Sequence, residues 1–257
     1  MSATPRLFVD DDLSDGASLD LSDEHARYLN QVLRKKLGDP VRVFNGRDGE
    51  FEARVENFSK HGGSLTCEHR TREQTTSPDL HLLFAPLKRQ RTDLVVEKAT
   101  ELGASVILPV FTARTNADTV RTDRLRAICI EAAEQTERLE IPQVGEPLTL
   151  DKALDNWPQD RRLIFADESG DDGAAPWGGA TGRAAPILEA LTPFKDKQSR
   201  WAILIGPEGG FSPDERSTLR TLPFVTSVSL GPRILRAESA ALAAMAVWQS
   251  VLGDWRG

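Results

Sequence analysis

Two stretches near the C-terminus decide the fold of this chain: WAILIGPEGGFSPDE at Trp201–Glu215 and LGPRILRAESA at Leu230–Ala240. Each is typical of a short buried strand, a loop with Gly and Pro, and a helix. In the first, the apolar run Ala202–Ile205 has strand length, and the glycines after it permit positive φ and close approach of the backbone to a ligand. Gly and Pro also mark ordinary turns, but two such loops at equivalent strand ends predict a small-molecule site in an α/β sheet.

The residues after the first loop carry the signals of a helix start. Ser212 suits the N-cap, Pro213 suits the first helical position, and Glu215 stands three residues after the cap. We expect the next elements to be a strand over Phe224–Leu230 and a helix over Ala237–Gly253.

Composition sets the broad class. The chain has 257 residues, enough for one large or two small domains with full cores. It has no apolar run of membrane-span length and no basic start followed by a hydrophobic stretch. Its two cysteines, Cys67 and Cys129, lie far apart, which predicts reduced thiols and a cytoplasmic protein. The four histidines show no metal-ligand spacing with either cysteine, so we expect no metal.

The basic residues are clustered although the formal net charge is −7. That charge argues against a protein that binds nucleic acid over its whole surface, but a local patch suffices, because salt screens charges beyond about 8 Å. Any one basic cluster is also typical of a solvent-facing surface; together they favour an RNA-binding surface. The residues assigned to it are Arg6, Arg34, Lys35, Lys88, Arg89 and Arg91, and another cluster holds Arg121, Arg124 and Arg126.

Residues 1–75 are expected to form a separate small domain of short antiparallel strands and one helix, a pattern that suggests a small β-barrel. The helix is predicted over Ser22–Leu37, and the polar stretch Thr71–Asp79 is the expected linker. The apolar residues expected to be buried along the helix are Leu29, Val32, Leu33 and Leu37. The expected strands are Arg6–Val9, Val41–Phe44, Glu50–Phe58 and Ser64–Glu68.

Residues 76–257 alternate between strands and helices, which predicts a mostly parallel sheet covered by helices on both faces. The Gly-rich stretch Ser169–Arg183 is expected to be a flexible loop. Besides the C-terminal elements, the expected strands are His81–Ala85, Val106–Val110 and Leu163–Ala166, and the expected helices are Arg91–Leu102, Thr122–Leu139 and Pro186–Leu191.

The order of the two C-terminal motifs resembles the knotted SPOUT methyltransferases, and within them the RsmE family, which methylates N3 of a uridine in 16S ribosomal RNA. GPEGG is followed by LGPRILRAESA, with Ser239 where the family has Thr, a change that keeps the hydroxyl. The other segments similar to the family are Lys98–Gly103 (KATELG), Arg114, Glu131–Arg138 (EAAEQTER), His25, Val32–Arg34 (VLR) and Gly38–Asp39.

This resemblance implies a trefoil-knotted α/β domain behind an N-terminal PUA-like RNA-binding domain. It also implies S-adenosylmethionine as cofactor, 16S rRNA or the small ribosomal subunit as partner, and a homodimer. The sulfonium methyl group is electrophilic in itself, so the protein need only bind the cofactor, orient it and exclude water. The residues expected to bind it are Leu204, Ile205, Gly206, Pro207, Glu208, Gly209, Gly210, Leu230, Gly231, Ile234, Leu235 and Arg236.

Uracil N3 carries a proton that must leave before the nitrogen attacks, and the base must be unpaired or flipped. Arg236 and Arg114 are the candidates for stabilising the anionic uracil. Glu238 is the candidate general base, although a carboxylate in a first helical turn is often only a dipole partner. Glu208 could bind cofactor or fix its own loop.

Three other functions stay open at this point. One is another nucleotide-binding enzyme, which the absence of the G-x-G-x-x-G and P-loop patterns disfavours. Another is a non-catalytic RNA-binding factor for ribosome assembly. The third is a SPOUT methyltransferase that acts on a different RNA.

Overall fold

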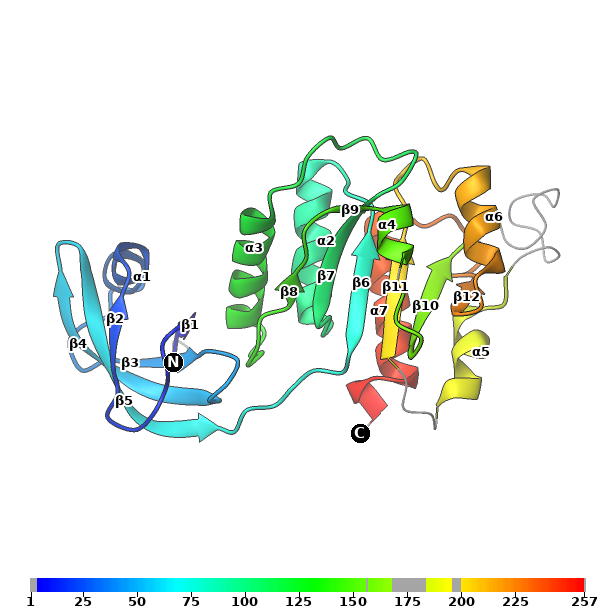
Figure 1. Ribbon diagram of the computed structural model, residues 1–257. Coiled ribbons are helices and arrows are strands. Elements are labelled where there is room, and N and C mark those ends of the chain that lie inside the picture. The colour runs from blue at the N-terminus through cyan, green and yellow to red at the C-terminus, as the bar shows by residue number, and fades with distance from the viewer. Residues whose placement is uncertain (1–3, 156, 168–183, 196–199, 257) are drawn as a thin grey trace. The chain divides into compact units, whose positions relative to one another are not determined.

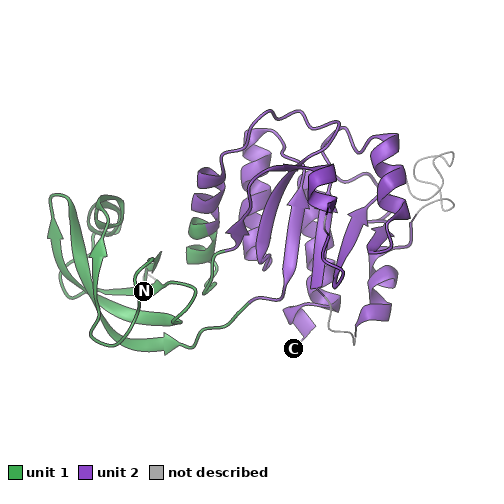
Figure 2. Cartoon of the chain, in the orientation of Figure 1, with its two compact units in different colours: residues 1–76, 130–141 green, residues 77–129, 142–257 purple. Residues whose placement is uncertain are grey.

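The computed structural model describes residues 4–155, 157–167, 184–195 and 200–256 (Figure 1). It divides into two compact units: unit 1 holds residues 1–76 and 130–141, and unit 2 holds residues 77–129 and 142–257 (Figure 2). The sequence predicted one break after residue 75, whereas residues 130–141 group with unit 1. The Gly-rich stretch Ser169–Arg183 lies outside the described residues.

Unit 1 is built on a five-stranded sheet in the order β1-β3-β4-β5-β2. Its strands are β1 (Arg6–Phe8), β2 (Ser18–Leu21), β3 (Pro40–Phe44), β4 (Glu50–Ser59) and β5 (Gly62–Arg72). The expected antiparallel pairing holds except that β1 lies parallel to β3. Strand β2 was not predicted, and β5 extends into the expected linker.

The helix of unit 1 is much shorter than the sequence pattern indicated. It consists of α1 (Asp23–Arg27) and a π-helical turn, η1 (Tyr28–Val32), and Arg34 then takes a φ of 54°. The α-helical spacing of apolar residues therefore changes in the π-helical turn and ends at Arg34. Leu29 is fully buried as predicted, but the predicted burial of Val32 and Leu37 is wrong: they are 66% and 64% exposed.

Arg6 is buried and holds unit 1 together. Its Nε lies 2.7 Å from Oε2 of Glu50, a carboxylate with no exposed surface. Its other nitrogens donate to the carbonyls of Ala133, at 2.7 Å, and Arg138, at 2.8 Å. A guanidinium at the C-terminal end of a helix, here α3 (Thr122–Gln135), satisfies carbonyls that lack helical partners. The prediction that Arg6 contacts RNA is therefore wrong, because its donors are committed inside the unit.

Helix α3 ends earlier than predicted. The pattern favoured a helix to Leu139, but Glu137 has a φ of 60° and stops it. Leu139 is nevertheless buried, in a cluster with Phe8, Phe44 and Ala133.

Unit 2 has a seven-stranded sheet in which every recorded pairing is parallel, as predicted. The order is β12-β10-β11-β6-β7-β8, with β9 also paired to β7. The strands are β6 (Leu80–Phe84), β7 (Val106–Phe111), β8 (Gln143–Val144), β9 (Leu148–Thr149), β10 (Arg161–Ala166), β11 (Arg200–Ile205) and β12 (Val225–Val228). The two-residue strands β8 and β9 are too short to show a sequence pattern.

Helices cover both faces of this sheet, because its strands are apolar on both sides (Figure 1). One face packs in a core cluster that includes Leu150 of α4 and Leu219 of α6. On the other face α7 packs against β11, α2 and α5. The helices are α2 (Arg89–Glu101), α4 (Leu150–Leu154), α5 (Ile187–Leu191), α6 (Pro213–Thr221) and α7 (Ala237–Val251), with 3₁₀ turns η2 (Thr192–Phe194) and η3 (Asp254–Arg256).

An ion-pair cluster sits at the amino ends of these strands. Asp79 accepts hydrogen bonds from Arg161 at 3.0 Å and from Arg200 at 2.6 Å, and His81 Nε2 lies 3.2 Å from its other oxygen. Burial alone would raise the pKa of Asp79, but the two arginines hold it below its ordinary value. Burial, with the positive charge of Arg161, lowers the pKa of His81 to about 4 despite Asp79.

This low pKa makes the free energy of unfolding depend on pH. In the unfolded chain a histidine titrates near a pKa of about 6.5, so as the pH falls the unfolded state binds the proton first and gains stability over the folded state. We expect His81 to account for a loss of about 2 kcal/mol between pH 7.5 and pH 5. Denaturant unfolding of the wild type and His81→Gln at both pH values checks this. The variant has no titrating group at this position, so its free energy of unfolding should fall less than that of the wild type by that amount. Equal losses would contradict the assignment.

Candidate functional site

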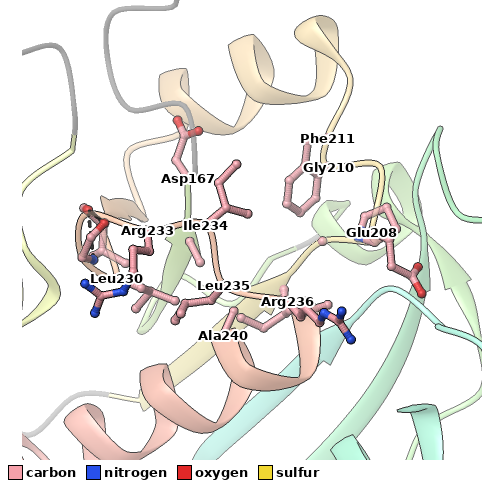
Figure 3. Close-up of a pocket in the computed structure, with 18 of the residues that line it drawn as sticks. Asp167, Glu208, Gly210, Phe211, Leu230, Arg233, Ile234, Leu235, Arg236 and Ala240 are labelled. Carbon is pink, nitrogen blue, oxygen red and sulfur yellow. Dashed lines mark hydrogen bonds between the residues drawn. The ribbon is translucent and has the colours of Figure 1, made fainter. Parts of the chain in front are cut away.

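A cavity of about 360 Å³ lies where β10, β11 and β12 reach their carboxyl ends (Figure 3). Because the strands are parallel, the segments that follow them leave the sheet at the same edge. The lining residues are Ala166, Ile205 and Val228 at the ends of β10, β11 and β12, Asp167 after β10, Gly206, Pro207, Glu208, Gly210 and Phe211 on the first loop, Ser229, Leu230, Gly231, Arg233, Ile234, Leu235 and Arg236 on the second, Ala237 and Ala240 on α7, and Arg91 on α2.

The first loop owes its shape to glycine at two positions. A Cβ on Gly206 would lie 2.6 Å from the ring of Phe211, so only glycine lets that ring pack over the strand end. Phe211 is buried there with its ring edge-on to Phe165, at 5.1 Å between centroids. Gly210 turns the chain with a φ of 65°. The Phe211 ring is therefore a fixed wall of the cavity.

The predicted capping box is confirmed, and it does more than start α6. Ser212 Oγ accepts the N–H of Glu215 at 3.2 Å, and Glu215 Oε2 accepts the N–H of Ser212 at 2.8 Å. The other oxygen of Glu215 accepts the N–H of Ala113 at 2.7 Å, and Arg114 donates to the carbonyl of Gly209 at 3.0 Å. The segment after β7 is thus tied to the first loop from outside the cavity.

The second loop presents apolar side chains to the cavity. Gly231 has a φ of 113°, and Ser229 Oγ accepts its N–H at 3.3 Å. Leu235 is half-buried, whereas Ile234 is 59% exposed. Figure 3 shows these two residues between Asp167 at one end of the cavity and Arg236 at the other.

Three charged residues meet beside the first loop. Arg91 Nη1 lies 3.5 Å from Oε1 of Glu208, and its Nε lies 3.7 Å from Oε1 of Glu238. The Glu238 side chain is 14% exposed, and its Oε2 has no hydrogen-bond partner among the residues that the structure describes. Arg91 thereby links α2 to the first loop and to the start of α7.

Asp167 is a lining residue that sequence reasoning missed. It directly follows β10 and is 3% exposed. Its carboxylate lies 3.3 Å from Nε of Arg216 and accepts from Nε of Arg220 at 2.8 Å. These ion pairs fix α6 against β10, so Asp167 shapes the cavity by positioning its neighbours.

The structure brings most of the predicted cofactor residues to one cavity. Leu204 is an exception, since it is fully buried in the core, and Gly209 also lies outside the lining. Of the candidate catalytic residues, Arg236 lines the cavity, while Glu238 and Arg114 lie beside it. The lining residues that were not predicted for the cofactor are Arg91, Ala166, Asp167, Phe211, Val228, Ser229, Arg233, Ala237 and Ala240.

Of the other predicted RNA contacts, Lys88 and Arg89 are exposed at the start of α2, and Arg34 is exposed in unit 1, where Lys35 is half-buried. Within the described ranges, no three or more His, Cys, Asp or Glu side chains are arranged to hold a metal, and no helix is long and apolar enough to cross a membrane. Cys67 and Cys129 are both buried.

A cavity between glycine loops at the carboxyl edge of a parallel sheet defines an α/β domain that binds a small ligand. Residues 74–249 match the family model of the RNA methyltransferase domain, and residues 21–65 match that of the RNA methyltransferase PUA domain. The chain is 32% identical to ribosomal RNA small subunit methyltransferase E of Rickettsia conorii, over 94% of this chain and 93% of that protein. It therefore belongs to the RNA methyltransferase family, among proteins of the ribosomal RNA small subunit methyltransferase E (RsmE) type.

Solved structures agree. The enzyme of this type from Neisseria gonorrhoeae, bound to S-adenosyl methionine, has a TM-score of 0.81 at 28% identity, covering 98% of this chain and 100% of that one. A putative methyltransferase from Legionella pneumophila in complex with the same cofactor has a TM-score of 0.82 at 29% identity, covering 98% and 99%. The SPOUT α/β fold with an N-terminal PUA domain, predicted from sequence, is confirmed.

The Glu215 contacts predict a measurable stability effect. Ser212→Ala removes one capping hydrogen bond and should cost about 1 kcal/mol. Glu215→Ala should cost more, because two backbone N–H groups, of Ser212 and Ala113, lose their acceptor. Denaturant unfolding measures both, with Asp214→Ala, which shares the helical turn but makes neither contact, as the control. A Glu215→Ala loss no larger than the control's would contradict this role.

Proposed function

We propose that this protein transfers the methyl group of S-adenosylmethionine to N3 of a uridine in 16S rRNA of the small ribosomal subunit. We propose further that it does so in the cytoplasm and as a homodimer. The observation that carries the proposal is the cavity itself, where the two motif loops meet at the carboxyl edge of the sheet in a chain of this family.

The residues around the cavity suit the proposed cofactor. Backbone N–H and C=O groups of the two loops can pair with an adenine edge, and the missing Cβ of Gly206 leaves the Phe211 ring in place as a wall. Ile234 and Leu235 offer apolar surface, and Glu208 is a lining carboxylate 3.5 Å from Arg91. When bound, the cofactor supplies an electrophilic methyl group, and the protein's part is to orient it and exclude water.

The acceptor requires a group that favours the uracil anion. Arg236 is exposed and lines the cavity, so its guanidinium can lie beside O2 or O4 of a base that enters there. Glu238, whose buried Oε2 has no hydrogen-bond partner in the described part of the chain, is the proposed acceptor of the N3 proton. Arg114 acts indirectly, by holding the carbonyl of Gly209.

A glycine substitution tests the cofactor cavity. Gly206→Ala forces the Phe211 ring to move, because the new Cβ would meet it at 2.6 Å, and we expect the affinity for S-adenosylmethionine to fall at least tenfold. Gly209→Ala is the matched control, since its Cβ would find only an ordinary 3.4 Å contact with Arg114. Calorimetric titration of both variants, with melting temperatures to confirm folding, gives the comparison. Equal affinity for the wild type and Gly206→Ala would place the cofactor elsewhere.

The reaction is tested with pure protein, labelled cofactor and three acceptors: small ribosomal subunits, bare 16S rRNA and transfer RNA. We expect label in a small-subunit substrate, with nuclease mapping and mass spectrometry placing one methyl group on N3 of one uridine. Label on transfer RNA alone would identify another RNA as substrate, and RNA binding without transfer would identify a non-catalytic assembly factor. Either outcome would overturn the proposal.

A further inference from the structure

A second cavity of about 760 Å³ adjoins the first within unit 2. Arg91 and Glu208 line both cavities, so the two are neighbours across that ion pair. Its other walls come from the segment between β6 and α2, the segment between β7 and α3, and the start of α3. The residues lining it besides that pair are Pro86, Leu87, Lys88, Arg89, Thr92, Asp93, Asn116, Ala117, Asp118, Thr119, Val120, Arg121, Arg124 and Leu125.

The side of this cavity formed by α2 carries two basic residues that do not stabilise the fold. Lys88 is the N-cap of α2 and Arg89 its first residue, both exposed, and the first turn holds no acidic residue. Cations at a helix N-terminus are unfavourable, because they face the positive end of the helix dipole. Across the described part of the chain neither residue has a recorded ion-pair partner, whereas Arg124 is paired with Asp93 in the same wall. Lys88 and Arg89 therefore suit an anion from outside the chain.

The remaining walls suit a nucleobase. Val120 and Ala117 are half-buried and offer small apolar surfaces, while the amide of Asn116 is exposed. An amide carries both donors and an acceptor, which is what the edge of an unpaired base requires. The volume is within the range of small-ligand sites and exceeds that of the first cavity.

We propose that this second cavity holds the acceptor nucleotide, with Lys88 and Arg89 on its flanking phosphates and the base turned toward the first cavity past Arg91 and Glu208. This inference rests on the proposed function, which it deepens by assigning the RNA its own site. Arg91 is then the residue that touches both substrates, since it is the cation shared by the two cavities.

The test uses Lys88→Gln with Arg89→Gln, in the full chain, with small ribosomal subunits as substrate. We expect the KM for subunits to rise roughly tenfold at physiological salt, and the slope of log KM against log salt to fall by about 0.7 for each phosphate contact removed. The affinity for S-adenosylmethionine should stay within twofold, and the melting temperature should hold or rise, because two cations leave a helix N-terminus. Lys152→Gln with Lys195→Gln, at two exposed lysines outside both cavities, is the control for the loss of two positive charges.

The outcomes separate this inference from the proposed function. If the wild type methylates no RNA, the proposed function is wrong, and so is this inference. If the wild type is active and the double variant has the same KM for subunits and the same salt slope, this inference is wrong and the proposed function stands. The same holds if the double variant melts at lower temperature or changes its mass in solution, since the basic residues would then serve folding or contact between copies of the chain.

Discussion

Everything at the site depends on the single direction of the strands in unit 2. Because the recorded pairings are all parallel, the loops after β10, β11 and β12 emerge at one edge, along with the start of α2 after β6. An antiparallel strand in the middle of this sheet would move one of those loops to the opposite edge. The core supports the arrangement from both faces, so the loops can adopt strained or glycine-dependent shapes without carrying the stability of the fold.

Hydrogen bonds and ion pairs of charged side chains then set the distances between these loops. Glu215 joins the segment after β7 to the first loop, Asp167 joins β10 to α6, and Arg91 joins α2 to the first loop and α7. Glu215 and Arg91 each take two partners from different elements, whereas both partners of Asp167, Arg216 and Arg220, lie on α6. Such shared partners hold neighbouring elements at fixed distances around a small cavity.

The sequence was informative where the signal is local. A capping box, an apolar run and a loop rich in glycine are all read within a few positions, and the first loop and α6 were predicted accordingly. Arg6 was misassigned because its partner Ala133 lies 127 positions away. Asp167 was missed because nothing near it in the chain distinguishes a carboxylate that will meet two arginines of α6. Val32 was misplaced because it lies in the π-helical turn η1, which does not keep the α-helical spacing that the residue types alone suggest.

The pairing of basic residues explains how a chain of net charge −7 can present a basic site. Many arginines here are structural: Arg6 binds carbonyls in unit 1, and Arg161 joins Asp79 at the amino edge of the unit 2 sheet. Paired cations of this kind add nothing to the field felt by an approaching phosphate beyond a few ångströms, because the partner cancels them. What remains is set by unpaired cations, and Lys88 and Arg89 at the rim of the second cavity have no recorded ion-pair partner among the residues that the structure describes. For this chain, whether each basic residue is paired is therefore a better indicator of an RNA-binding surface than the net charge.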